Sequence, residues 1–127
     1  LSKDNSAPVG PAATRAAAGA TEHQAIVQVT NLSSTLKSLK EKGFWVYGAE
    51  GSEQSKSLYD LEFADDNVVL VLGAEGKGIR RLVKDHCDFL LAIPMSGKID
   101  SFNVSVAGGI IMAEIQRQRS CFSVKKP

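Results

Sequence analysis

Residues 68–78 read VVLVLGAEGKG, in which five consecutive apolar residues run directly into a glycine-rich loop. An uninterrupted apolar strand is typical of a parallel sheet that is covered on both faces. A glycine-rich turn at the carboxyl end of such a strand is where open α/β folds usually bind ligands. The stretch therefore predicts an α/β domain with a ligand site that begins at Gly73.

Strand-like and helix-like segments alternate on both sides of this stretch. Apolar and β-branched residues predict strands at 25–29, 44–48, 68–72 and 89–93. Helices are predicted at 12–18, from a cap at Thr30 or Asn31 to Gly43, at 79–86 and at 101–119. The polar segment 50–66 is expected to be a surface loop with a turn of helix around 58–60. The alternation implies one domain over residues 1–127, with a mostly parallel sheet flanked by helices.

The composition excludes several classes of protein. Apolar residues make up 43% of the chain and charged residues 23%, as in folded globular proteins. No apolar run approaches the roughly 18 residues that suggest a membrane span, so we expect no membrane partner. The net charge of +1 supplies no general basic field for nucleic acid, although it does not exclude RNA binding.

The cysteines and histidines are few and widely spaced. Cys87 and Cys121 form no C-x-x-C pair, which favours a reducing cytoplasm over an oxidising compartment. His23 and His86 have no metal-ligand spacing to each other or to the cysteines. We therefore expect no metal site.

The glycine loop matches neither of the two common phosphate-binding patterns. Its order G-x-x-G-x-G differs from the dinucleotide fingerprint G-x-G-x-x-G, and Ile79 and Arg80 follow Gly78 where a P-loop has Lys and Ser or Thr. The carboxylate of Glu75 would repel a phosphate in the loop. The loop therefore favours a neutral or cationic ligand. The alternative is a tight turn with φ > 0 and a solvated Glu75.

The tripeptide Ile93-Pro94-Met95 follows the last predicted strand. Pro94 has no N–H and directs the chain out of the sheet, which keeps the Ile93 carbonyl and the Met95 amide at the strand terminus. These groups could read an adenine edge while the Ile93 and Met95 side chains line an apolar slot. The alternative is a strand that merely ends at a proline. Lys98, in the following turn, could contact either a phosphate or solvent.

The last predicted helix is apolar on nearly every side. Ser101 is a suitable N-cap, with Asn103 in the first turn. A helix without a polar face is buried or lies in an interface, and Gly108-Gly109 suggests the close approach of another backbone. Arg117 and Arg119 are expected at a solvated helix end, with contact to RNA as the alternative.

Three segments resemble, in their order and spacing, the second and third motifs of the SpoU (TrmH-like) RNA ribose methyltransferases of the SPOUT superfamily: 71–78, 92–97 and 101–110. The linking segment 80–88 and the upstream segment 5–9 are similar to the family as well. The resemblance implies a C-terminal deep trefoil knot and a homodimer that forms through the last helix. It also implies methyl transfer from S-adenosylmethionine to a ribose 2′-hydroxyl of structured RNA.

Within this family, the sequence resembles most the branch that modifies a guanosine in 23S ribosomal RNA. The alternatives are a methyltransferase for transfer RNA and a non-catalytic homologue that binds RNA or the cofactor. An unrelated nucleotide-binding module is a further alternative, and it would prefer NAD or ATP.

The resemblance also implies roles for single residues. Four residues would hold the cofactor, largely through backbone groups: Gly73, Ile93, Met95 and Phe102. Family members usually carry Leu at the last of these positions. Three polar residues would organise the catalytic site and the target nucleotide: Glu75, Ser101 and Asn103.

One part of the family pattern is missing from these 127 residues. The first motif of the family carries an Asn and an Arg, and the Arg is the favoured activator of the 2′-hydroxyl. Arg15 lies in a different context and does not replace it. The attacking hydroxyl must lose its proton or be strongly hydrogen-bonded. We therefore expect an N-terminally truncated catalytic domain that lacks its first strand and helix and is inactive alone.

Overall fold

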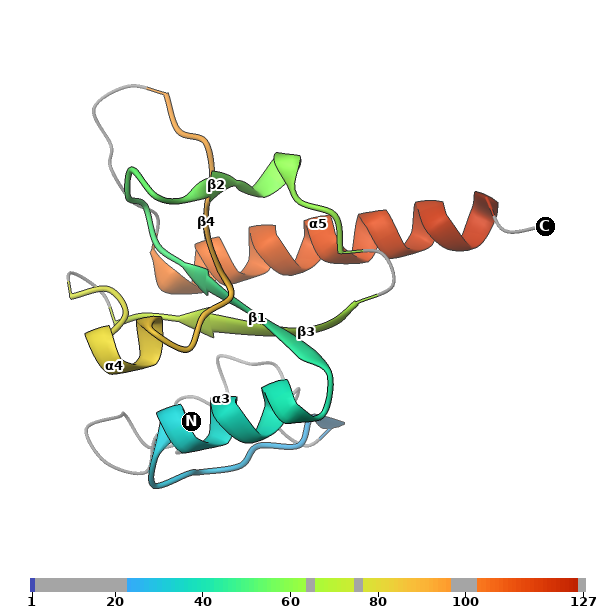
Figure 1. Cartoon of the computed structure of the whole chain (residues 1–127). Helices are drawn as coiled ribbons and strands as arrows, with labels where there is room; N and C mark the ends of the chain where they lie inside the picture. Colours follow the sequence, from blue (N-terminus) through green and yellow to red (C-terminus); the bar gives the residue numbers. More distant parts are fainter. Residues whose placement is uncertain (2–22, 64–65, 75–76, 97–102, 126–127) are drawn as a thin grey trace. The chain divides into compact units, whose positions relative to one another are not determined.

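The computed structural model describes residue 1 and residues 23–63, 66–74, 77–96 and 103–125 (Figure 1). The chain forms two compact units, Leu1–Thr35 and Leu36–Pro127. The second unit contains a parallel sheet with helices packed on it, which confirms the predicted α/β class. The predicted helix at 12–18 lies outside the described residues.

The predicted strand at 25–29, in the first unit, is wrong. Ile26 and Val27 are 41% and 65% exposed. The Leu1 amino group donates to the Val27 carbonyl at 3.0 Å, and the Val29 amide donates to the Leu1 carbonyl at 2.7 Å. These β-branched residues are not buried against a sheet, and their strand preference depends on such packing.

The predicted helix before Gly43 is confirmed as α3 (Leu32–Glu41). The side-chain oxygen of Asn31 accepts the Ser34 amide at 3.1 Å, which is the geometry of an N-cap. Gly43 follows the helix with a φ of 92°, a left-handed conformation that favours glycine. Leu36, on the predicted apolar face, is buried.

The four strands of the sheet are parallel and lie in the order β2-β4-β1-β3 (Figure 1). Their bounds are Phe44–Ala49 for β1, Lys56–Ser57 for β2, Asn67–Leu72 for β3 and Phe89–Ala92 for β4. Tyr47 of β1 lies opposite Leu70 of β3 on one side and opposite Phe89 of β4 on the other. Three of the strands were expected from their apolar runs: β1, β3 and β4. Among the described residues, β4 and β1 are the two inner strands.

The segment 50–66 is only in part the predicted surface loop. Two of its residues form β2, and η1 (Leu58–Asp60) is the predicted turn of helix. Leu58 and Phe63, however, are fully buried. Because their neighbours in the sequence are mostly polar, the sequence pattern does not predict that these two side chains belong to the core.

The strand β3 lies at the edge of the sheet in the part of the chain that the structure describes. Its side chains from Val68 to Val71 are half-buried, and Leu72 is 39% exposed. The prediction that an apolar run marks a strand is confirmed, but the expected burial on both faces is not seen here.

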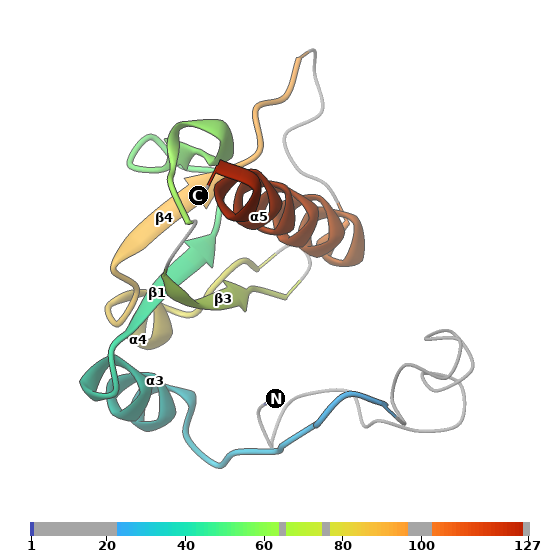
Figure 2. The same cartoon turned by 90° about the vertical axis from the view of Figure 1, so that its right-hand side faces the viewer.

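The core lies between the sheet and α5 (Val104–Lys125), which runs along one face (Figure 2). Seven buried side chains form it: Tyr47, Leu58, Leu61, Phe63, Leu91, Ile111 and Ile115. On the other face, a Cβ at Gly48 would stand 2.9 Å from both Ile79 and Cys87. The helix predicted at 79–86 is reduced to α4 (Arg81–Lys84).

The helix α5 begins and ends later than predicted. The side-chain oxygen of Asn103 accepts the Ser105 amide at 2.8 Å, so Asn103 caps the helix that Ser101 was expected to cap. Neither glycine nor proline occurs between residues 110 and 126, and the helix continues beyond Arg119 to Lys125.

Gly108 and Gly109 differ in their surroundings. A Cβ at Gly108 would stand 3.0 Å from a methyl carbon of Leu72, whereas no described atom lies within 4 Å of the corresponding position at Gly109. The predicted approach of another backbone is therefore not seen among the described residues. Val106 and Met112, close to Gly109 along the helix, are 49% and 58% exposed.

Two further expectations concern the path of the chain and its surroundings. The predicted trefoil knot depends on the path through 97–102, which lies outside the described residues. In the described ranges, no helix has both the length and the apolar character that a membrane span requires.

Candidate cofactor site

The glycine loop and the Ile93–Met95 segment both follow the carboxyl ends of strands. These ends lie on one side of the sheet, which we call the carboxyl edge, as distinct from the outermost strand. Both β3 and β4 pair in parallel with β1, so the residues that follow them lie on either side of Glu50, at the end of β1. Gly108, in the second turn of α5, lies against Leu72 at the end of β3, which brings the start of the helix to the same edge. This carboxyl edge is where parallel sheets usually bind ligands.

The glycine loop closes on itself at its base. Ala74 and Gly78 form an isolated bridge, and the Gly78 amide donates to the Ala74 carbonyl at 2.9 Å. Gly78 has a φ of 67°, which favours glycine. A Cβ on Gly73 would stand only 2.3 Å from the carbonyl carbon of Gly78. Both glycines are thus required by the loop geometry, as the sequence predicts for a tight turn.

Glu50 is a component of this edge that the sequence analysis missed. Its Oε2 lies 2.7 Å from Nζ of Lys84, and its side chain is 18% exposed. Its amide donates to the Leu91 carbonyl at 3.0 Å, and its carbonyl accepts the Ser55 hydroxyl. A single acidic residue in a polar segment gives no sequence signal of such a position.

Ile93 and Met95 follow β4 at this edge and are both half-buried. Ile93 packs against the core, and Pro94 between them is exposed. Among the residues that the structure describes, the backbone of 93–95 makes no hydrogen bond outside the strand pairing. Half-buried apolar side chains beside backbone groups at the end of a strand fit a planar, hydrogen-bonding ring such as adenine.

The remaining predicted site residues are only in part within the described ranges. Asn103 is described, and its side-chain oxygen caps α5. The others, together with the lysine of the following turn, lie outside: Glu75, Ser101, Phe102 and Lys98. The structure therefore places Gly73 and Ile93 after the two strands that flank β1, and Met95 two residues beyond Ile93.

A sequence model of the SpoU rRNA Methylase family matches residues 1–113. This chain belongs to that family. The 23S rRNA (guanosine-2′-O-)-methyltransferase RlmB of Pseudomonas aeruginosa is 49% identical to it over 118 residues, which are 93% of this chain and 47% of that protein. The chain thus spans about half the length of the curated relatives that it matches.

Solved structures of the family share the fold. The TrmH/SpoU tRNA modifying enzyme of A. aeolicus has a TM-score of 0.81 and 31% identity, covering 95% of this chain and 59% of that one. The AdoMet-bound rRNA methyltransferase of Sinorhizobium meliloti has a TM-score of 0.82 and 25% identity, covering 92% of this chain and 44% of that one.

In this SpoU domain, the two arginines of α5 bind other parts of the chain. Arg117 donates twice to the carboxylate of Glu114, at 2.7 and 2.8 Å, and these hydrogen bonds lower the pKa of that carboxyl group. Arg119 donates to the Asp66 carbonyl at 2.8 Å. The predicted solvation is confirmed for Arg117, whose side chain is 62% exposed, whereas Arg119 is half-buried. Neither residue is at the helix end, because α5 continues to Lys125.

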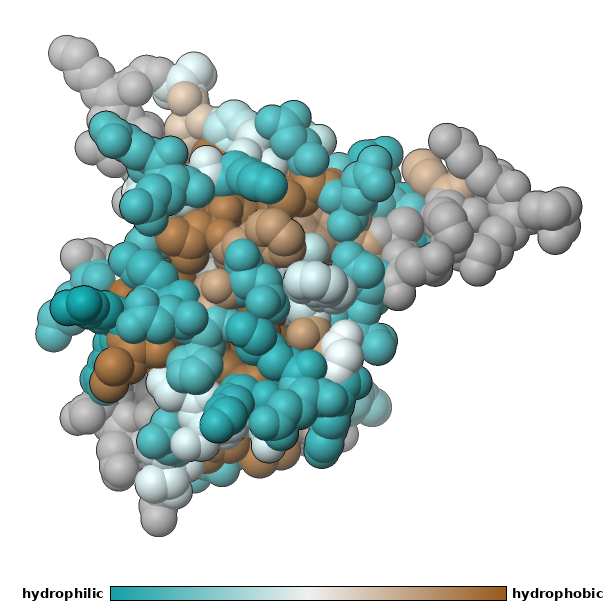
Figure 3. Space-filling view, in the orientation of Figure 1, coloured by the Kyte–Doolittle hydropathy of each residue, from teal (hydrophilic) through white to brown (hydrophobic). Residues whose placement is uncertain are grey.

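Apolar residues gather over β2 and β4 at the centre of the face shown in Figure 3.

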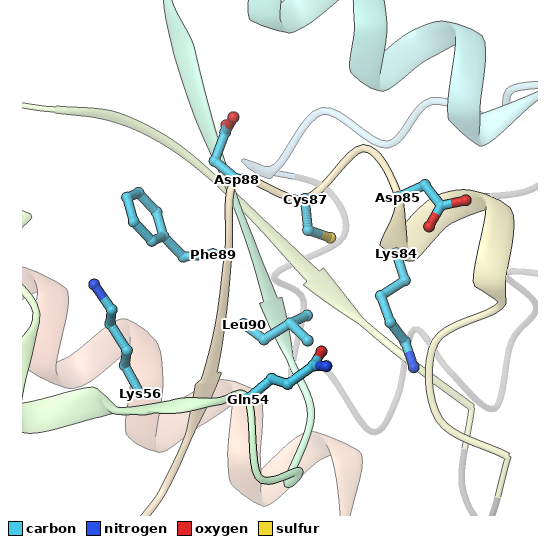
Figure 4. A pocket seen from close by; sticks show the side chains of 8 residues that line it. All are labelled: Gln54, Lys56, Lys84, Asp85, Cys87, Asp88, Phe89 and Leu90. Atoms are coloured by element: carbon cyan, nitrogen blue, oxygen red, sulfur yellow. The ribbon is translucent and has the colours of Figure 1, made fainter.

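A pocket of about 440 Å³ lies apart from the predicted site residues of the SpoU domain, beside the end of α4 and the start of β4 (Figure 4). In the pocket wall, Nζ of Lys56 lies 5.1 Å from the ring centre of Phe89. Burial, and then the charges of Asp88 and Glu50, raise the pKa of the Cys87 thiol, which is therefore protonated at neutral pH. The pocket is lined by both charged and apolar side chains, and this lining favours no single class of ligand.

No group of three or more His, Cys, Asp or Glu side chains that could hold a metal ion occurs in the described part of this SpoU domain. Both cysteines are free thiols.

Proposed function

We propose that this chain is the cofactor-binding part of an S-adenosylmethionine-dependent methyltransferase that modifies the ribose 2′-hydroxyl of a guanosine in 23S ribosomal RNA. The observation that carries the proposal is that Gly73 and Ile93 follow the two strands that pair in parallel with β1, in a chain of the SpoU family. The name of the Pseudomonas relative supports the substrate, and the AdoMet-bound relative supports the cofactor.

The residues at this edge suit S-adenosylmethionine. Bound there, it would supply an activated methyl group. Gly73, Ile93 and Phe102 would hold it largely through backbone groups, with Met95 beside them. Glu75, in the loop, suits a cationic sulfonium better than a phosphate.

For the target nucleotide, we assign Ser101 and Asn103 to organising the site. Asn103 combines this role with capping α5, so its side chain is held by the helix terminus. The 2′-hydroxyl still needs a group that takes or strongly binds its proton. These 127 residues contain no match to the first motif that carries the family's Arg, and we propose that they do not transfer the methyl group alone.

The outer face of α5 supports a homodimer. Val106, Gly109 and Met112 are three residues apart, so they form one exposed apolar row, and a facing helix could approach closely at the glycine. Exposed apolar rows of this kind mark protein interfaces. We further propose that the domain carries the family's trefoil knot and acts in the cytoplasm, where free thiols persist.

Transfer RNA is the second candidate substrate, because the A. aeolicus relative is named as a tRNA modifying enzyme. The higher identity to the 23S rRNA enzyme favours ribosomal RNA.

An NMR titration of the isotopically labelled chain with S-adenosylmethionine tests the proposal. We expect amide shifts that cluster at Gly73–Gly78, at Ile93–Met95 and at Asn103. NAD and ATP serve as competitors, and a stronger response to either would contradict the proposal. An unchanged spectrum with S-adenosylmethionine would also contradict it.

A further inference from the structure

Glu50, the residue after β1, forms an ion pair with Lys84 of α4 beside the glycine loop. The Glu50 amide donates to the carbonyl of Leu91, two residues before Ile93. Its carboxylate binds Nζ of Lys84, at the end of α4, at 2.7 Å. The other carboxylate oxygen lies 2.9 Å from where a Cβ on Gly78 would stand. One residue therefore contacts β4, α4 and the glycine loop.

The backbone of Gly78 is in direct contact with Gly73, the predicted cofactor residue. The backbone of Gly78 and the amide of Ile79 lie 2.3 to 2.6 Å from where a Cβ on Gly73 would stand, so the two ends of the loop are in contact. Because Gly78 has no side chain, the Glu50 carboxylate lies against the loop backbone. A displacement of this carboxylate would move Gly78 and, with it, Gly73.

We propose that the Glu50–Lys84 pair sets the position of the glycine loop for S-adenosylmethionine, an inference that rests on the proposed function. Both are positioning residues that act through Gly78 and do not touch the cofactor. Without Lys84, the carboxylate, which is 18% exposed, would turn toward water to regain solvation, and the loop would lose its contact.

The chain offers a matched control for this pair. Lys40 and Asp88 form a second ion pair at 3.2 Å, and another oxygen of Asp88 accepts the Val46 amide. The side-chain exposures are 35% and 18%, against 37% and 18% for the Lys84–Glu50 pair. This second pair lies at the start of β4, at the opposite end of the strand from the glycine loop. We therefore expect that breaking it leaves the loop in place.

The experiment compares the wild-type chain with Lys84→Met and Lys40→Met. Amide hydrogen exchange is measured by NMR without cofactor, and affinity for S-adenosylmethionine is measured by titration. We expect Lys84→Met alone to speed exchange of the Gly78 amide and to weaken cofactor affinity about two- to fivefold, the effect of a partly exposed ion pair. Glu50→Gln should reproduce both effects.

Four results would each refute one claim: the role of the pair in the loop, its effect on the cofactor site, its local action, or the proposed function. Equal Gly78 exchange in the two lysine variants would refute the role in the loop. Faster exchange at Gly78 with unchanged cofactor affinity would show that the pair orders the loop but not the site, and the inference would fail. Faster exchange at core amides such as Tyr47 as well would show a general loss of stability instead. A wild-type chain that does not bind S-adenosylmethionine would refute the proposed function, while the exchange data would still decide whether the pair holds the loop.

Discussion

Replacing Gln118 with Met is expected to destabilise the domain by roughly 2–3 kcal/mol, because Gln118 fixes a buried segment to α5. Its Nε2 donates to the Leu61 carbonyl at 2.8 Å, and its Oε1 accepts the Phe63 amide at 2.7 Å. Both backbone groups flank the fully buried ring of Phe63. The side chain thus provides hydrogen-bond partners for the Leu61 carbonyl and the Phe63 amide, which lie outside the strands of the sheet.

The magnitude follows from these two hydrogen bonds. Each contributes about 1 kcal/mol net, and a backbone group left without a partner in a partly buried place costs more than the bond contributes. Met has a similar length and volume, so little is added for a cavity. The third contact of Gln118, to Glu114 at 3.4 Å, is too long to count.

Urea unfolding, followed by the fluorescence of the single tryptophan Trp45, measures the effect. With a slope of about 1–2 kcal/mol per molar urea, a loss of about 2–3 kcal/mol should lower the Gln118→Met midpoint by about 1–3 M. Gln116→Met is the matched control, since Gln116 lies on the exposed face of the same helix. It should change the stability by less than about 0.5 kcal/mol. Equal midpoints for the two variants would refute the reasoning.

Three further perturbations test the loop, the dimer and the pH dependence. Gly73→Ala places a Cβ 2.3 Å from loop backbone, so S-adenosylmethionine affinity should fall by about tenfold or more, whereas Gly109→Ala, in open space, should not weaken it. Met112→Glu adds a charge to the exposed apolar row of α5, and sedimentation should show loss of the dimer without loss of folding. Arg117→Met removes the hydrogen bonds that lower the pKa of Glu114; this stabilisation is present above the unfolded pKa near 4.5 and is lost as the pH falls through the folded value. Wild type should therefore exceed Arg117→Met in stability at neutral pH, and the gap should close in acid; a gap that is constant with pH would contradict this.

The fold was predictable wherever one segment of sequence carried its own signal. The apolar runs of β1, β3 and β4 and the Asn31 cap of α3 are local features, and the structure confirms them. The segment 25–29 carries a similar local signal but forms only a single bridge at Val29, because its exposed side chains have no sheet to pack against. The two residues of β2 are too few and too polar to show any periodicity.

The candidate site was predictable in its backbone but not in its supporting side chains. Gly73 and Ile93 follow strands, and parallel pairing must bring such residues to one edge. Glu50 and Gln118 act on groups that are distant in sequence, Gly78 and Leu61 among them. Nothing about a polar residue in isolation indicates which distant backbone it will meet. Asn103 took the capping role expected of Ser101, since either residue type suits that position.

The charges of α5 bear on how RNA is bound. Arg117 is engaged by Glu114, and Arg119 by the Asp66 carbonyl, so the helix end offers less free positive charge than its sequence suggests. The net charge of the chain is only +1. Affinity for RNA depends strongly on the number of phosphates that cations neutralise. A domain of this composition is therefore better suited to recognising a nucleotide at the edge of its sheet than to holding a large RNA by charge. Under the proposed function, most of the affinity for ribosomal RNA should then come from surfaces other than the end of α5.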